Sequence, residues 1–164
     1  MSARLAGFWK SLVLGFLVFL FFVFMAGLDF VVHRVLYGYG LCFSYSWAGF
    51  YWSVFGCVFV IFGCVVGFVY WFGSQKRGRD AKVGLGLFLS VCLFSLGGLE
   101  DVLWFVLWGG GLPSDNAVWW WMPWCRLFGF WNSSLQLALL GTVSVVVCAF
   151  WVWALSERKK IYLQ

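Results

Sequence analysis

Charged side chains are scarce in this chain of 164 residues: only 10% are Asp, Glu, Lys or Arg, whereas 64% are hydrophobic and 24% are aromatic. A soluble domain has about 25% charged residues, which cover its surface with groups that water solvates. The shortage excludes a water-soluble globule and also an intrinsically disordered chain, which needs high charge and low hydrophobicity. It excludes a basic DNA-binding domain too, so we expect no nucleic-acid partner.

Histidine is almost absent as well, since His33 is the only one in the chain. A single imidazole excludes haem ligation by two histidines of this chain, and it excludes a proton relay built on histidines. The sequence also lacks H-E-x-x-H, a Walker loop, G-x-S-x-G and C-x-x-C, which carry metal, phosphate, acyl-transfer and redox chemistry. Whether the chain is an enzyme therefore stays open at the level of motifs.

Four long apolar stretches are the main feature that the sequence does contain. A helix needs about 20 consecutive apolar residues to cross a bilayer, and stretches of that length occupy residues 8–32, 47–71, 83–108 and 133–153. They predict an all-α integral membrane protein in which residues 1–164 form a single polytopic domain. We expect a bundle of four transmembrane helices, with longer connections at residues 33–46 and 109–132.

Basic residues are concentrated before the first stretch, between the second and third, and after the fourth: Arg4, Lys10, Lys76, Arg77, Arg79, Lys82, Arg158, Lys159 and Lys160. The connections 33–46 and 109–132 contain only Arg34 and Arg126. Because Lys and Arg favour the cytoplasmic side, we predict that both termini face the cytoplasm or matrix, in a cell membrane or an organelle inner membrane. The two sparsely charged connections then lie on the outer side.

The connection 109–132 is rich in tryptophan, with Trp119, Trp120, Trp121 and Trp124 on either side of Met122-Pro123. Tryptophan prefers the headgroup layer of a bilayer, so we predict an interfacial or shallow re-entrant segment at residues 118–131. Its tryptophans and Arg126 are candidate contacts to lipid or to a partner.

Two further expectations concern the outer connections. We expect Ser114, Asp115 and Asn116 to cap a short helix, because their side chains accept hydrogen bonds from free backbone amides. Cys42 and Cys125 both belong to outer connections, and they can form a disulfide if that side of the membrane is oxidising.

Ionisable residues within the spans raise a functional question, because each costs about 2.5–3.5 kcal/mol on insertion scales. Asp29, His33 and Arg34 follow one another near the end of the first span, and Glu100 and Asp101 lie in the third. Asp29 is about 31 Å of helix from Phe8, and Glu100 is about 26 Å from Val83 in the same direction across the membrane. We therefore expect Asp29, Glu100 and Asp101 to lie at similar depths. With His33, which shares a helix face with Asp29, they are called the acidic cluster.

Three interpretations of the acidic cluster remain open. In the first, Asp29 or Glu100 forms neutralising ion pairs with Arg34 or Arg126. In the second, His33, Asp29 and Glu100 or Asp101 hold one divalent metal ion, since an imidazole with carboxylates suits hard or borderline ions. In the third, Glu100, Asp101 and Asp29 perform acid–base chemistry on an apolar substrate.

The run Gly98-Leu99-Glu100-Asp101-Val102-Leu103-Trp104-Phe105 resembles the acidic, aromatic-flanked motif of integral-membrane carotenoid (lycopene) cyclases. In that family a Pro-Leu-Glu-Glu run precedes aromatic residues, and Asp29 is similar to an aspartate near the end of an earlier span. Here Gly98 stands in place of the proline and Asp101 in place of the second glutamate. The resemblance implies cofactor-free, proton-driven cyclisation of an isoprenoid chain, with Glu100 and Asp101 as the acids.

These observations favour a non-enzymatic subunit or binding protein of a membrane complex, in which the acidic cluster binds a partner, a lipid or a metal ion. The small size, the missing catalytic motifs and the aromatic outer connection support this hypothesis. Its partners would be the bilayer and either other membrane subunits or further copies of the chain. The alternative is a small membrane enzyme that acts on a hydrophobic lipid or isoprenoid.

Overall fold

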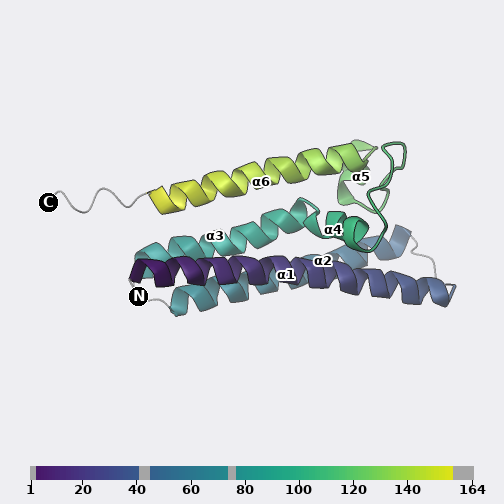
Figure 1. The fold of residues 1–164 in the computed structure, drawn as a ribbon. Coiled ribbons are helices and arrows are strands. Elements are labelled where there is room, and N and C mark those ends of the chain that lie inside the picture. The colour runs from purple at the N-terminus through teal and green to yellow at the C-terminus, as the bar shows by residue number, and fades with distance from the viewer. Residues whose placement is uncertain (1–2, 41–44, 74–76, 157–164) are drawn as a thin grey trace. The chain divides into compact units, whose positions relative to one another are not determined.

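The computed structural model describes residues 3–40, 45–73 and 77–156, and all regular secondary structure in these ranges is helical (Figure 1). The helices, in chain order, are α1 Ala3–Gly38, α2 Tyr45–Phe72, α3 Arg77–Leu96, α4 Leu99–Leu107, α5 Pro123–Phe128 and α6 Ser133–Ser156. The predicted all-α class is confirmed.

Three of these helices are long and apolar enough to cross a membrane by themselves. The apolar segments are Leu12–Leu36 of α1, Gly49–Phe72 of α2 and Ser133–Ala154 of α6. A fourth candidate span arises only when Ala81–Leu96 of α3 and Leu99–Leu107 of α4 are taken together. Helix length and hydropathy are therefore those of an integral membrane protein in a lipid bilayer, with three or four spans.

The first helix is longer than the predicted span 8–32. It continues to Gly38, because no glycine or proline interrupts residues 28–37, and it ends just before Gly40, whose φ is +68°. His33 and Arg34, which the sequence places at the boundary between the first span and the connection 33–46, are consequently helical residues.

The third predicted span, residues 83–108, is not one continuous helix. It is broken at Gly97 and Gly98, and Gly98 has φ +67° and ψ +32°, a left-handed conformation that ends α3 and precedes α4. Glycine adopts this conformation without the steric cost that a Cβ would bring. The length of the apolar run predicts the length of the span. Its hydropathy does not predict the interruption that divides the span into α3 and α4.

The chain forms two compact units. The first contains Met1–Trp52 and Gly98–Leu135, and the second contains Ser53–Gly97 and Gln136–Gln164. In the first unit, α4 packs against α1 (Figure 1). The prediction of a single polytopic domain stays a prediction.

Glycines allow the helices of the second unit to approach closely. A Cβ on Gly67 of α2 would lie 2.7 Å from the backbone oxygen of Gly84 in α3, so the two backbones are almost in contact. A Cβ on Gly86 of α3 would lie 3.0 Å from the ring of Phe150 in α6. Small residues at such crossings let helices in membranes pack backbone to backbone.

The connection 109–132 is fastened to the first turn of α6 by hydrogen bonds. The carboxylate of Asp115 accepts bonds from Ser134, at 3.0 Å from its backbone amide and 2.6 Å from its hydroxyl. Asn132 caps the same helix by accepting from the amide of Leu135 at 3.0 Å. Asp115 therefore caps α6 and not a short helix after residue 116, where the chain forms a turn.

Candidate functional site

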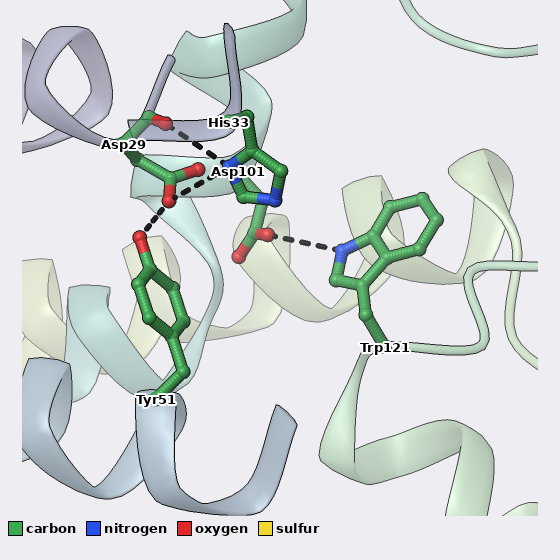
Figure 2. Close-up of polar contacts among 5 residues, drawn as sticks. All are labelled: Asp29, His33, Tyr51, Asp101 and Trp121. Carbon is green, nitrogen blue, oxygen red and sulfur yellow. Dashed lines mark hydrogen bonds and ion pairs between the residues drawn. The ribbon is translucent and has the colours of Figure 1, made fainter. Parts of the chain in front are cut away.

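The acidic cluster begins on α1, where Asp29 and His33 lie one turn apart. Nδ1 of His33 is 3.0 Å from the backbone oxygen of Asp29 and 3.2 Å from its Oδ1 (Figure 2). The hydroxyl of Tyr51, near the start of α2, donates a hydrogen bond to the same Oδ1. Asp29 is thus held by groups from two helices.

The other two carboxyl groups lie in the first turn of α4 and are buried. Glu100 is 4% exposed and Asp101 is 8% exposed. Oδ1 of Asp101 accepts a hydrogen bond from Nε1 of Trp121 at 3.3 Å (Figure 2). Within the part of the chain that the structure describes, Oε1 of Glu100 and Oδ2 of Asp101 have no hydrogen-bond partner.

Aromatic packing between α1 and α4 brings the two halves of the acidic cluster together. The ring of Trp104 lies 5.6 Å from that of Phe30 and 6.1 Å from the imidazole of His33, measured between ring centres. Gly27 leaves room for Trp108, whose ring would lie 3.0 Å from a Cβ at that position. The structure therefore places Asp29 close enough to both Glu100 and Asp101 for electrostatic interaction.

A second group of aromatic rings packs around Asp101 from the connection 109–132. Trp119 is fully buried, and its ring centre lies 5.5 Å from that of Trp121 and 5.0 Å from that of Phe105. The indole nitrogens of Trp119 and Trp104 are also buried without a hydrogen-bond partner among the described residues. Asp101 thus bonds a ring, that of Trp121, which is packed with Trp119 and Phe105.

The tryptophans predicted as lipid or partner contacts divide into two groups. Trp119 and Trp121 pack against Phe105 beside Asp101. Trp120 is 39% exposed, and Trp124 is half-buried beside Trp131. Contact of the predicted tryptophans and of Arg126 with lipid or a partner stays a prediction.

The cluster has more acidic than basic groups. Arg34 lies with its guanidinium carbon 5.2 Å from the ring centre of Phe30. His33 is the basic group shown beside Asp29, with its Nδ1 3.2 Å from Oδ1 of Asp29. Ion pairing of Asp29 or Glu100 with Arg34 or Arg126 stays a prediction.

The metal-ligand set predicted from the sequence was Asp29, His33, Glu100 and Asp101. In the described ranges, no group of three or more His, Cys, Asp or Glu residues is arranged to hold a metal ion. His33 instead uses its Nδ1 on Asp29. Metal binding by this set stays a prediction. The predicted pairing of Cys42 with Cys125 concerns Cys42, which lies outside the described residues, and Cys125, which has a free thiol.

Sequence reasoning missed Tyr51 and Gln136. Tyr51 is one of six tyrosines in an aromatic-rich chain, and nothing in its neighbourhood marks it as the donor to Asp29. Gln136 is fully buried in α6 and donates to the backbone oxygen of Gly97 at 2.5 Å. A glutamine within an apolar run is the pattern that could have identified it, because an amide in a span needs a polar partner.

No family model, no curated protein and no solved structure matches this chain. The likeness to carotenoid cyclases therefore rests on Gly98–Phe105 and Asp29 alone. Conclusions about function depend on the chemistry of the acidic cluster.

Proposed function

We propose that this chain is a non-enzymatic subunit or binding protein of a membrane complex, and that its acidic cluster takes up a cation within the membrane. One observation supports the proposal above all others. Glu100 and Asp101 are buried side by side, and each retains a carboxyl oxygen that no described group satisfies. Buried polar atoms in proteins are almost always hydrogen-bonded, so an unpartnered pair of acceptors is a reason to expect a ligand.

The charges of the acidic cluster predict a positively charged ligand. Three carboxyl groups, those of Asp29, Glu100 and Asp101, are near one another, and His33 is a basic group that interacts with Asp29 and Asp101. An ionised carboxylate in an apolar environment is very unfavourable unless a positive charge or a proton neutralises it. A cation, a proton included, would supply such neutralisation at the unpartnered oxygens of Glu100 and Asp101.

The location of the cluster follows from the distribution of basic residues. If both termini face the cytoplasm or matrix, as the positive-inside rule predicts, the ends of α1 and α4 that carry the cluster face the outer half of the membrane. The connection 109–132 would then cover the cluster from the outer side. Its exposed aromatic residues, Trp120 and Phe130 among them, would contact lipid headgroups or a neighbouring subunit.

The proposal is tested by measuring the thermal stability of the purified protein in mild detergent while the cation concentration is varied. Protons, Na⁺, Ca²⁺ and Zn²⁺ are the probes, each added separately to wild type and to a Glu100→Gln/Asp101→Asn variant. A ligand that binds only the folded state raises the melting temperature by mass action. We expect at least one probe to stabilise the wild type and to lose most of that effect in the variant.

The matched control is Asp115→Asn, because Asp115 is an exposed carboxylate that caps α6 and lies outside the acidic cluster. It should lower the melting temperature without altering the response to cations. Identical responses of wild type and the double variant to all four probes would refute the proposal.

A second candidate function is supported by the aromatic rings around Asp101. Carboxylic acids beside a group of packed rings that includes Trp104, Trp119 and Trp121 would suit protonation of an isoprenoid double bond, because aromatic ring faces stabilise developing positive charge. Lipid analysis of cells with and without the chain tests it. New cyclised products that disappear in Asp29→Asn, Glu100→Gln and Asp101→Asn variants would favour the enzyme, and unchanged lipids would exclude it.

A further inference from the structure

The interruption between α3 and α4 leaves a backbone carbonyl that a regular helix would have used. In an unbroken helix the oxygen of Gly97 would accept from the amide of Asp101, four residues later. Here that oxygen accepts from Nε2 of Gln136 at 2.5 Å, and α4 begins with the bond from the amide of Val102 to the oxygen of Gly98 at 3.1 Å. A side chain of α6 has taken the place of a backbone donor.

Gln136 is built into this position and is not an incidental neighbour. Its side chain is completely buried. Gly97 is also closely packed, because a Cβ there would lie 3.1 Å from Cγ2 of Val143, two turns further along α6. A carbonyl inside a membrane span has no water to satisfy it, so a buried donor is required wherever a helix is interrupted.

The bond from Gln136 to the oxygen of Gly97 also affects the acidic cluster, because it leaves the backbone amide of Asp101 without that acceptor. The amide of Asp101, which no longer bonds Gly97, interacts with the carboxyl group of its own residue. If the helix closed through Gly97 and Gly98, this amide would be withdrawn from the carboxyl group. The turn that carries Glu100 and Asp101 begins directly after Gly98, so its start depends on this interruption.

We infer that Gln136 is a positioning residue, which holds the helix interruption at Gly97–Gly98 open and thereby sets the acid pair at the start of α4 against Asp29. The inference rests on the proposed function, since it assigns to Gln136 the control of cation uptake by that cluster. Gln136 itself does not touch the cation. It acts through the carbonyl of Gly97.

The test compares Gln136→Met, which keeps the length of the side chain and removes the donor, with the control Ser144→Ala. Ser144 also lies in α6, and its hydroxyl bonds the backbone oxygen of Leu140 within that helix, away from the interruption. Two readouts are needed. The first is residue-resolved hydrogen exchange in detergent micelles, and the second is the cation concentration that gives half of the thermal stabilisation.

We expect Gln136→Met to change the exchange rates of the amides of residues 99–101 by about fivefold, since one hydrogen bond is worth about 1 kcal/mol, and to leave residues 83–93 unchanged. The cation concentration that gives half of the thermal stabilisation should shift by about 10- to 100-fold. This is the range for groups that orient ligating residues without contacting the ion. Ser144→Ala should alter neither.

A second variant keeps the inference testable if Gln136→Met does not fold. Gly98→Ala introduces a Cβ at φ +67° and disturbs the interruption without touching Gln136, so it should produce the same changes. Unchanged exchange at residues 99–101 in the folded Gln136→Met or Gly98→Ala protein overturns the inference. Altered exchange in a protein whose wild type responds to no cation would overturn the proposed function and leave the positioning role of Gln136 intact.

Discussion

Glu100 is the residue on which the proposed function depends most. Its side chain is 4% exposed, and its Oε1 contacts no hydrogen-bond donor in the described chain. Removing one member of a buried ion pair is strongly destabilising, because it leaves the other charge uncompensated. Oε1 of Glu100 has no such partner among the described residues, so the negative charge of Glu100 is uncompensated whenever the group is ionised.

The first prediction is therefore that a substitution in the protein interior does not lower the melting temperature. Glu100→Gln keeps the shape of the side chain and removes the charge, so in cation-free buffer at neutral pH the melting temperature should stay equal to that of wild type or rise. The residual cost of a buried amide without a partner is about 1–3 kcal/mol, less than that of a buried charge. Thermal unfolding in detergent measures the effect. A fall of more than a few degrees would mean that Glu100 is ion-paired in the folded protein.

The second prediction concerns Tyr51. Tyr51→Phe removes the hydroxyl that donates to Asp29, and a hydrogen bond to a charged group contributes about 1.5–3 kcal/mol. We expect the free energy of unfolding of Tyr51→Phe to be lower than that of wild type by about this amount, measured by thermal or denaturant unfolding in detergent. Tyr39→Phe is the matched control, because the side chain of Tyr39 is 79% exposed and should be indifferent to the loss of its hydroxyl. Equal stability of both variants would show that the Tyr51–Asp29 bond is not formed in the membrane protein.

At this scale the sequence predicts contacts within a helix better than contacts between helices. The spacing of Asp29 and His33 places them on one face, and the structure shows them in contact. Tyr51 is 22 residues away from Asp29, and its contact depends on where α1 and α2 lie. No pattern within either helix contains that information.

At the scale of helices, the crossing of α2 and α3 gives the third prediction. Gly67→Ala would place a Cβ 2.7 Å from the oxygen of Gly84, a backbone atom that cannot move without its helix. Such overpacking costs about 1–3 kcal/mol. Gly56→Ala in the same helix meets nothing within 4 Å and should be neutral or slightly stabilising, because alanine favours helices. Similar melting temperatures for the two variants would contradict the close crossing.

Helix existence follows from hydropathy, whereas helix interruption does not. Residues 47–71 and 133–153 predict α2 and α6 to within a few residues, because an apolar run of membrane length has one stable form. The run 83–108 is equally apolar, yet it divides at Gly97 and Gly98. A pair of glycines in a glycine-rich chain indicates either helix packing or interruption, and the donor from Gln136 that favours interruption lies 39 residues away.

At the scale of the whole molecule, the fourth prediction is the orientation in the membrane. An epitope tag after Gln164 should be protected from protease added outside the cell or organelle, because basic segments stay on the cytoplasmic or matrix side. Ser114→Cys, made after replacement of Cys42 and Cys125 by serine, should react with a membrane-impermeant maleimide from outside. The opposite pattern would reverse the orientation and place the acidic cluster in the inner half of the membrane.

The central claim is that Glu100 and Asp101 bind a cation, and infrared difference spectroscopy of their carboxyl groups tests it most directly. The spectrum of the purified protein is recorded before and after addition of protons or of the metal ion that stabilises it. We predict a change in the carboxyl bands that disappears in the Glu100→Gln/Asp101→Asn variant and persists in Asp115→Asn. Carboxyl bands that respond identically in wild type and in the double variant would contradict the account.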